Sequence, residues 1–378
     1  MNTGLPASDV AGRCGRLEFA LAARELPALL VTNRSNVRYL TGFTGSIARV
    51  LVAPGRRPAL VVDGRYRTQA EEELAAHAVD ADLLVAQTMP EIHAAMAAWL
   101  RGSASCGFEA ATVTVAEHER FAGALGVGLT PTTDLVEQLR AVKDDGEIAR
   151  LERASAIASA ALADVIASLD EGPTEAEFAR ALDRRMVDLG ASGPSFDTIV
   201  ASGPNAAKAH ARPGDRRIST GDSLVIDFGA EVDGYHSDMT RTALLGPVDP
   251  WLVEAFEVVE RAQAAGVAAA SAGIDGQALD AVCRDSITAD GFGEWFTHGT
   301  GHGIGLDIHE SPWAIRGSQD VLVAGNVVTV EPGVYRGELG GVRIEDAVVI
   351  TTDGCRPLTL TPKDLSCLRS PPTTSRPE

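Results

Sequence analysis

The sequence predicts a two-domain protein, in which a small α/β domain precedes a larger α+β domain. The chain has 378 residues, more than one domain of about 100–200 residues usually contains. Strand-like and helix-like segments alternate before residue 140, whereas long helices and strand–turn–strand segments follow it. A charged stretch with a glycine, 140–147, indicates a domain boundary at about 138–146. We therefore expect domains at 1–140 and 141–368, and a Pro- and Ser-rich disordered tail at 369–378.

The first domain shows short apolar runs between helical segments. Runs of five or six apolar residues predict strands, and longer segments with helical spacing predict helices. The polar stretch NRSNVRYLTGFT, residues 33–44, contains a glycine, so we expect a loop there. The other expected elements are a helix leading into a strand at 17–31, strands at 48–53 and 58–62, and helices at 65–76 and 91–101.

Two segments of the second domain repeat one pattern. They are SLVIDFGAEVDGYHSDMTRTALL and VVTVEPGVYRGELGGVRIEDAVVI. In each, an apolar strand ends in an acid, and a second strand carrying another acid follows a turn; Asp233-Gly234 forms the first turn. The pattern predicts two hairpins that face each other, each with two carboxylates. The other expected elements are helices at 147–169, 174–190, 251–271 and 276–290, and strands at 223–232, 235–245, 326–331 and 341–351.

Composition excludes several classes of protein. Apolar residues make up 45% of the chain and charged residues 22%, as in soluble globular proteins. The net charge of −19 argues against a nucleic-acid partner, because phosphate binding needs clustered Lys and Arg. No apolar run is long enough to span a bilayer, and no secretory signal is evident at the start. We expect a cytoplasmic protein with no membrane partner.

Four carboxylates lie in or beside the apolar strands of the repeated pattern: Asp227, Asp238, Glu331 and Glu345. An isolated ionised carboxylate in such surroundings costs several kcal/mol or is neutralised. For a single acid, a turn amide or an arginine is the ordinary partner. For four acids in two similar hairpins, a multivalent cation is the simplest one.

Histidines occur in the segment HGTGHGIGLDIHE, residues 298–310, which lies between the two acidic segments in the sequence. Its glycines argue against a helix, so the helical HExxH zinc site does not apply, and the spacing fits no nucleotide-binding loop. Four carboxylates and an imidazole suit two divalent ions such as Mn, Co, Fe or Zn. Two such ions sharing carboxylates activate water for hydrolysis. No serine or cysteine nucleophile motif is present.

The segments VIDFGAEVDGYHSDMTR, HGTGHGIGLDIHE, TVEPGVY and GVRIED resemble the pita-bread metallopeptidases. NVRYLTGFTGS and VVDGRYRTQA resemble the smaller N-terminal domain of the aminopeptidase P and prolidase branch. The resemblance covers about residues 16–365. It implies a pita-bread catalytic domain and two divalent ions, with Mn expected first and Co, Zn or Fe as alternatives.

The resemblance also implies a role for each matching residue. Asp227 and Asp238 would hold one metal, His302 and Glu331 the other, and Asp238 and Glu345 would bridge them. Glu331 would also accept the proton of the attacking water and pass it to the leaving nitrogen.

Four further residues match positions around the family's substrate. His210 matches a substrate-side histidine, His309 the one that stabilises the tetrahedral intermediate, and His298 one that lines the substrate pocket. Arg343 matches an arginine beside the metals and is expected to orient a ligand carboxylate. Ala209 departs from the family, which usually has Pro before the histidine assigned here as His210.

The expected activity is that of an Xaa-Pro aminopeptidase acting on small peptides with Pro in second position. The alternative is an Xaa-Pro dipeptidase, or prolidase, restricted to dipeptides. The arginine-rich insertion of larger prolidases is absent, and only Arg316 lies near its place. The carboxylate of a dipeptide would therefore need a cation from elsewhere, for which Arg38 and Arg49 are the candidates. A non-catalytic pita-bread binding protein is the remote alternative. The resemblance further implies a homodimer.

Overall fold

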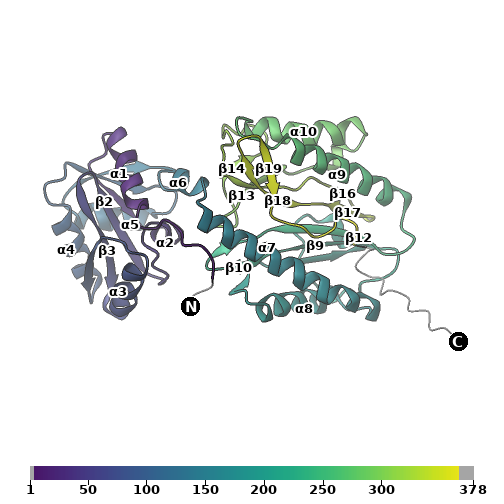
Figure 1. Cartoon of the computed structure of the whole chain (residues 1–378), viewed down its shortest axis with the longest axis horizontal. Coiled ribbons are helices and arrows are strands. Elements are labelled where there is room, and N and C mark those ends of the chain that lie inside the picture. The colour runs from purple at the N-terminus through teal and green to yellow at the C-terminus, as the bar shows by residue number, and fades with distance from the viewer. Residues whose placement is uncertain (1–3, 366–378) are drawn as a thin grey trace. The chain divides into compact units, whose positions relative to one another are not determined.

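The computed structural model describes residues 4–365, which form two compact units (Figure 1). One unit contains Ala7–Arg140 and the other contains the chain from Ala141 onward. Residues 4–6 group with the second unit, not with the first as the sequence suggested. The predicted tail at 369–378 lies outside the described residues.

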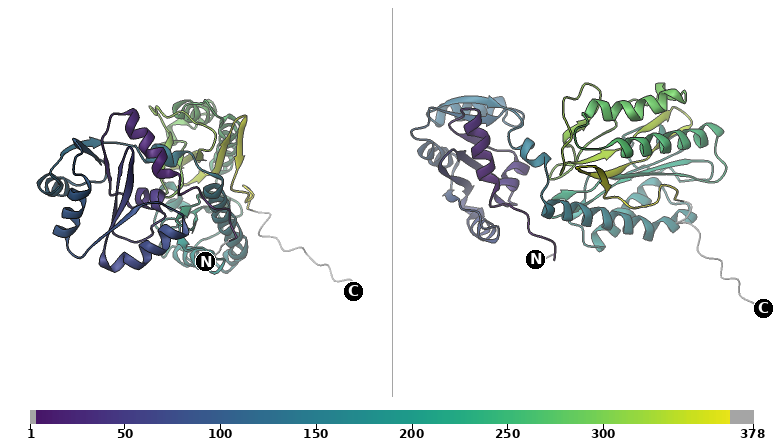
Figure 2. Two further views of the ribbon diagram at one scale, coloured as in Figure 1. Left: turned by 60° about the vertical axis from the view of Figure 1, so that its left-hand side comes forward. Right: turned by 45° about the horizontal axis from the view of Figure 1, so that its top comes forward.

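The N-terminal unit is built around a six-stranded mixed sheet with strand order β4-β3-β2-β1-β5-β6 (Figure 2). β1 pairs antiparallel with β2 and parallel with β5, and it therefore lies inside the sheet. The strands are β1 (Leu29–Val31), β2 (Ala48–Ala53), β3 (Arg56–Asp63), β4 (Asp82–Ala86), β5 (Ser105–Glu109) and β6 (Gly128–Thr132). The helices are α1 (Arg13–Ala23), α2 (Arg34–Thr41), η1 (Gly64–Tyr66), α3 (Arg67–Ala76), α4 (Met89–Trp99), α5 (Val115–Ala124) and α6 (Glu137–Ala141), the last of which ends at the unit boundary.

The loop expected at 33–44 is wrong, because α2 occupies most of it. The Asn33 side chain caps this helix by accepting hydrogen bonds from the backbone N–H groups of the second and third residues that follow it. Val37 and Leu40, three residues apart, are both buried. Gly42 ends the helix with a left-handed conformation, φ 74°. The short helix was missed because its apolar residues are few and its capping signals read as loop signals.

The second unit combines long helices with antiparallel strands (Figure 1). Every strand pair described in it is antiparallel. The helices are α7 (Asp145–Val165), η2 (Ile166–Glu171), α8 (Glu175–Asp188), η3 (Gly203–Ala207), α9 (Pro250–Ala269), α10 (Gly276–Ala289) and η4 (Gly293–Trp295). The strands are β7 (Gly193–Pro194), β8 (Ile199–Ser202), β9 (Ser223–Phe228), β10 (Ala230–Val232), β11 (Tyr235–His236), β12 (Met239–Leu244), β13 (Gly301–Gly303), β14 (Glu310–Ala314), β15 (Val327–Val330), β16 (Gly333–Arg336), β17 (Gly340–Arg343), β18 (Asp346–Thr351) and β19 (Gly354–Pro357).

Two helix pairs cover the strands of this unit from opposite sides (Figure 1). α7 and α8 pack on β9 and β12 through buried side chains such as Leu162, Leu182 and Ile226. α9 and α10 pack on β15 and β18 through side chains such as Val259 and Val348. Each helix pair buries its apolar face against one of the two strand pairs. The ends of these strands are left in the region between the two helix pairs.

The two facing hairpins predicted from the sequence are present. β9 pairs with β12, where Asp227 lies opposite Thr240, and β15 pairs with β18. The two pairs meet where the Glu345 backbone N–H donates to the Thr240 carbonyl at 3.1 Å. The four predicted carboxylates therefore lie at one seam.

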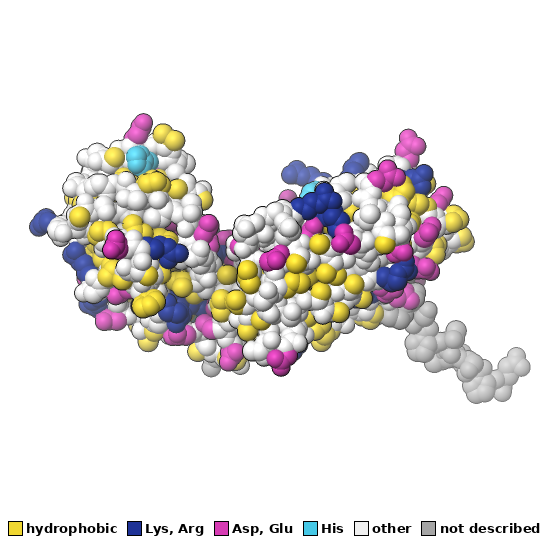
Figure 3. Space-filling view, turned by 90° about the horizontal axis from the view of Figure 1, so that it is seen from above, with side chains coloured by type: hydrophobic (Ala, Val, Ile, Leu, Met, Phe, Trp, Pro, Cys, Tyr) yellow, Lys and Arg dark blue, Asp and Glu magenta, His cyan; other side chains and the backbone are white. Residues whose placement is uncertain are grey.

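The described surface mixes charges of both signs. On the face shown in Figure 3, Lys and Arg side chains are scattered among Asp and Glu. Among residues 4–365, no helix has the length and apolar character that a bilayer crossing requires.

Candidate metal centre

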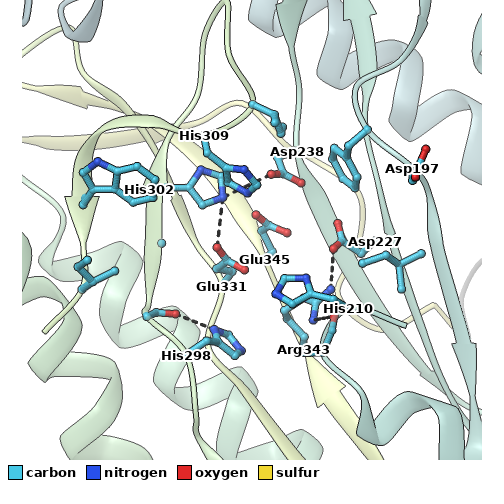
Figure 4. A pocket seen from close by; sticks show the side chains of 18 residues that line it. Asp197, His210, Asp227, Asp238, His298, His302, His309, Glu331, Arg343 and Glu345 are labelled. Carbon is cyan, nitrogen blue, oxygen red and sulfur yellow. Dashed lines mark hydrogen bonds and ion pairs between the residues drawn. The ribbon is translucent and has the colours of Figure 1, made fainter. Parts of the chain in front are cut away.

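The predicted metal ligands lie at or near the ends of strands that converge on one cavity. Asp227 is the fifth residue of β9, Asp238 immediately precedes β12 and His302 is the central residue of β13. Glu331 immediately follows β15, and Glu345 immediately precedes β18. Figure 4 shows the side chains of Asp238, His302, Glu331 and Glu345 pointing toward one another. The structure thus brings these side chains together from distant parts of the chain.

His302 presents a lone pair to two carboxylates. Its Nδ1 lies 3.0 Å from the Gly303 carbonyl, which only accepts, so Nδ1 carries the proton of the neutral ring. Burial lowers the His302 pKa to about 4, so the ring is neutral near pH 7 and Nε2 is an acceptor. Nε2 lies 3.4 Å from Glu331 Oε1 and 3.7 Å from Asp238 Oδ2. Three acceptors this close repel one another unless a cation lies between them.

The carboxylates of the cluster are crowded and buried. One ligand atom each from Asp238, His302 and Glu345 lies within 4.8 Å of the others. Burial and the neighbouring acids raise the pKa values of Asp238 and Glu345 well above their ordinary range. Burial, and then the charge of Asp227, raises the pKa of Glu331 to about 8. A divalent cation relieves the same repulsion without protonation, so the donor set fits the metals that the sequence predicts.

Unpartnered oxygen atoms supply a second sign of a missing cation. Asp227 Oδ1 and Glu345 Oε1 are buried and have no hydrogen-bond donor among the described residues. The other oxygen of each carboxylate is bound, Asp227 Oδ2 by Arg343 at 2.6 Å and Glu345 Oε2 by Thr240 Oγ1 at 2.7 Å. One oxygen of each acid is thus held by the protein, and the other is available as a ligand.

Thr240 and Arg343 hold the carboxylates in place. Arg343 Nε donates to Thr240 Oγ1 at 3.0 Å, and Thr240 donates onward to Glu345. Arg343 also donates to the Tyr335 hydroxyl at 2.8 Å and to the Ala209 carbonyl at 3.1 Å. The structure thus places Arg343 beside the cluster, as predicted. The Thr240 contact was missed, although its position opposite Asp227 could have been inferred from the strand register.

The three remaining predicted histidines line the same cavity, which has a volume of about 430 Å³. His210 and His309 are exposed on its wall. His298 is partly buried, and its Nε2 lies 2.9 Å from the Tyr335 hydroxyl. Since the hydroxyl of Tyr335 also receives a hydrogen bond from Arg343, it links His298 to the seam. Apolar lining residues that the sequence did not single out for this site are Phe196, Ile199, Ile308 and Ile315.

The glycines of the segment HGTGHGIGLDIHE allow close backbone packing. A Cβ atom at Gly301 would overlap the Thr329 carbonyl on the neighbouring strand β15. The His302 backbone N–H donates to Thr329 Oγ1 at 3.1 Å. The glycine therefore lets β13 approach β15 closely enough to place His302 beside Glu331.

Comparison with known proteins agrees with this geometry. Residues 149–352 match metallopeptidase family M24, and residues 13–142 match the creatinase/prolidase N-terminal domain. The chain belongs to metallopeptidase family M24. Its two matched regions place it in the aminopeptidase P and prolidase branch of that family.

Several relatives of family M24 resemble the chain over nearly its whole length. The Xaa-Pro dipeptidase of Pyrococcus horikoshii is 34% identical over 92% of this chain and 97% of that protein. The structure of an Xaa-Pro dipeptidase from Bacillus anthracis is 38% identical, with a TM-score of 0.89 over 94% of this chain and 99% of that one. An X-Pro aminopeptidase structure from Thermotoga maritima is 33% identical, with a TM-score of 0.82 over 92% of this chain and 99% of that one.

These findings confirm three sequence-based predictions. The fold is a pita-bread catalytic domain preceded by a creatinase-type α/β domain. The chain is a metallo-exopeptidase of family M24, so the non-catalytic alternative is not supported. Family membership implies divalent metal ions, and the cluster of Asp238, His302 and Glu345 is a candidate site for them.

Proposed function

We propose that the protein is an Xaa-Pro dipeptidase that hydrolyses the peptide bond before proline in small peptides. The observation that carries the proposal is the lone pair of His302 Nε2, which faces Asp238 and Glu331 in a cavity of peptide size. Relatives named Xaa-Pro dipeptidase favour the dipeptidase, which the sequence offered as the alternative, over the aminopeptidase it favoured.

The proposed ligands are the five residues that the resemblance implies. Asp227 and Asp238 would hold one divalent ion and His302 and Glu331 the other, and Asp238 and Glu345 would contribute to both. When bound, such ions acidify water and polarise a carbonyl oxygen. We propose Mn as the metal, with Co, Zn or Fe as alternatives.

The proton passes from water to the leaving nitrogen through Glu331. Its carboxylate lines the cavity and accepts a hydrogen bond from Thr329 Oγ1 at 3.3 Å. It takes the proton of the attacking water as the carbon–oxygen bond forms. It then returns that proton to the proline nitrogen as the carbon–nitrogen bond breaks. The leaving nitrogen needs this proton because an unprotonated nitrogen would depart as an unstable amide anion.

The side chains around Glu331 bind and orient the peptide. His309 and His210 face the cavity and donate hydrogen bonds to the carbonyl oxygen on which negative charge develops. His298 is fixed by Tyr335 and lines the substrate side. Arg343 keeps Asp227 in place.

An Xaa-Pro aminopeptidase is the second candidate, and one observation favours it. A dipeptidase must bind the free carboxylate of proline, but Arg343 is the one Arg or Lys among the described residues lining the cavity, and Asp227 already binds it. Arg316 is exposed and does not line the cavity, and Arg49 lines a separate cavity in the N-terminal unit. If the protein is a dipeptidase, the histidines that line the cavity would have to bind the carboxylate of the substrate's proline.

The test compares Ala-Pro with Ala-Pro-Ala as substrates of EDTA-stripped protein, before and after Mn or Co is added. Ala-Ala is the control, because it has the same first residue and an ordinary amide. We expect metal-dependent cleavage of Ala-Pro alone. Cleavage of the tripeptide would identify an aminopeptidase, and cleavage of neither proline peptide would overturn the proposed substrate class.

Two further predictions from the sequence are kept as proposals. The protein acts as a homodimer in the cytoplasm. Sedimentation of the purified protein tests the first, and fractionation of source cells tests the second.

A further inference from the structure

His309 lacks a side-chain anchor of its own. Among residues 4–365, no side-chain hydrogen bond or ion pair of His309 is described, and its ring contacts the ring of His302 edge-on at 4.4 Å between centroids. An exposed ring with so few contacts takes its position from the backbone that carries it. That backbone is the segment 303–310, which leaves β13 at Gly303 and enters β14 at Glu310.

A buried carboxylate holds the base of this segment. Gly303 pairs with Glu310 across the two strands, so the residue after His309 closes the segment. Glu310 Oε2 accepts a hydrogen bond from the Asp307 backbone N–H at 3.3 Å. Gly305 packs so closely on the Glu310 carboxylate that a Cβ atom there would overlap it. The segment is therefore folded around the Glu310 side chain.

Lys143 is the counterion of that carboxylate. Its Nζ donates to Glu310 Oε1 at 2.8 Å, and the two side chains are only 1% and 4% exposed. Ion pairs this deeply buried stabilise little by themselves, because desolvation offsets most of the attraction. Such a pair nevertheless fixes the two backbone segments that carry it relative to each other.

The backbone of Lys143 is fixed to the turn before β15. The Lys143 N–H donates to the Gly325 carbonyl at 2.9 Å. The Asn326 side chain donates to the Ala141 carbonyl at 2.8 Å. Two hydrogen bonds thus hold the backbone around Lys143 to this turn. β15 begins at Val327, directly after Asn326, and leads to Glu331. Lys143 thus connects the strand that carries Glu331 to the segment that carries His309.

We propose that Lys143 and Glu310 are positioning residues that set the place of His309 relative to Glu331. The inference rests on the proposed function, because it concerns the oxygen that His309 faces during hydrolysis. Neither side chain touches the substrate, so both act through His309. A displacement of about 1 Å in a supporting group is enough to slow a reaction 10- to 100-fold.

The test separates stability from position. K143M removes the counterion of a buried carboxylate and is expected to destabilise the protein, whereas the apolar pair K143M/E310L restores stability. We expect K143M/E310L to unfold near the wild-type midpoint and to bind the same amount of Mn. Its kcat for the cleaved Xaa-Pro peptide falls about 10- to 100-fold, with KM changed less than about twofold. L182A, a core variant away from the cavity, is the control for stability loss with unchanged kcat.

The decisive comparison adds the same changes to H309A. If the pair acts through His309, K143M/E310L lowers kcat no further in the H309A background. Equal fold-losses in both backgrounds, or recovery of wild-type kcat in K143M/E310L, would overturn the inference. If K143M/E310L does not fold, K143M/E310Q replaces it, because it removes the ion pair and keeps the size of residue 310 and the acceptor for the Asp307 N–H; the same two outcomes apply. A wild-type protein that cleaves no Xaa-Pro peptide refutes the proposed function instead.

Discussion

Arg343 and Asp227 form a 2.6 Å ion pair across 116 residues of sequence, with side chains 3% and 13% exposed. The pair joins β17 to β9 and so connects the two hairpins of the repeated pattern. Because Arg343 also binds Thr240 and Tyr335, one guanidinium orients the acids on one side of the cavity and the histidine on the other. The metal cluster therefore depends on a residue that binds no metal.

Replacing Arg343 is expected to destabilise the metal-free protein strongly. R343M leaves Asp227 buried without its partner, and breaking a buried pair in this way costs about 3–5 kcal/mol. Urea unfolding in EDTA measures the loss. The control is R356M, which breaks an ion pair between Arg356 and Glu152 whose side chains are 53% and 43% exposed. That pair should contribute less than about 1 kcal/mol, and equal losses in the two variants would contradict the account.

Without metal, stability is expected to fall as pH rises. The pKa of Glu331 is raised from 4.5 to about 8 in the fold, so the native state holds more protons than the unfolded state between these values. Its stabilising contribution is complete below about pH 4.5 and is lost as pH rises through about 8. Thermal unfolding in EDTA from about pH 5 to 8 tests this, with E331Q as a control of shallower slope. An unfolding temperature that rises from about pH 5 to 8 would contradict the raised pKa of Glu331.

Neutralising one acid should change stability and metal binding in opposite directions. D238N removes an acid from the buried, mutually repelling cluster, so we expect the metal-free protein to become more stable near pH 8. The same variant loses a ligand and should bind Mn less tightly and in smaller amount. Calorimetric titration with Mn and urea unfolding in EDTA provide both numbers. D353N, at an exposed turn, should change neither.

Adding one methyl group at Gly301 is expected to disrupt the site. In G301A the new Cβ overlaps the Thr329 carbonyl, so β13 must move away from β15 and carry His302 with it. Overpacking of this kind costs about 1–3 kcal/mol, and Mn affinity should fall as well. G354A is the matched control, because a Cβ there has no neighbour within 4 Å. Wild-type Mn affinity in G301A would show that the close approach is not needed.

The four carboxylates that the structure brings to one seam stand out in the sequence because they sit in an unusual context. Asp227 and Glu331 end apolar strands, where an acid needs a partner, and that need is visible without coordinates. The repeated strand–turn–strand pattern also predicted which strands pair. What the pattern could not supply was the register between the hairpins, which places Thr240 against Glu345.

Features that depend on distant contacts were missed. Lys143 and Glu310 are separated by 167 residues, and each alone reads as an ordinary surface charge. Helix α2 was read as a loop because its capping residues, Asn33 and Gly42, are also typical of loops. In both cases burial decides the outcome, and burial is set by the whole fold.

The most direct test of the central claim is to follow Ala-Pro hydrolysis while Mn is titrated into EDTA-stripped protein. The account predicts no cleavage without metal and a rise in kcat/KM that follows occupancy, reaching its maximum at about two ions per chain. E331Q loses a ligand and should need more Mn, but it should remain inactive even at Mn concentrations that load it, since it cannot accept the proton of water. Cleavage of Ala-Pro by metal-free protein, or an inactive wild type with both ions bound, would contradict the account.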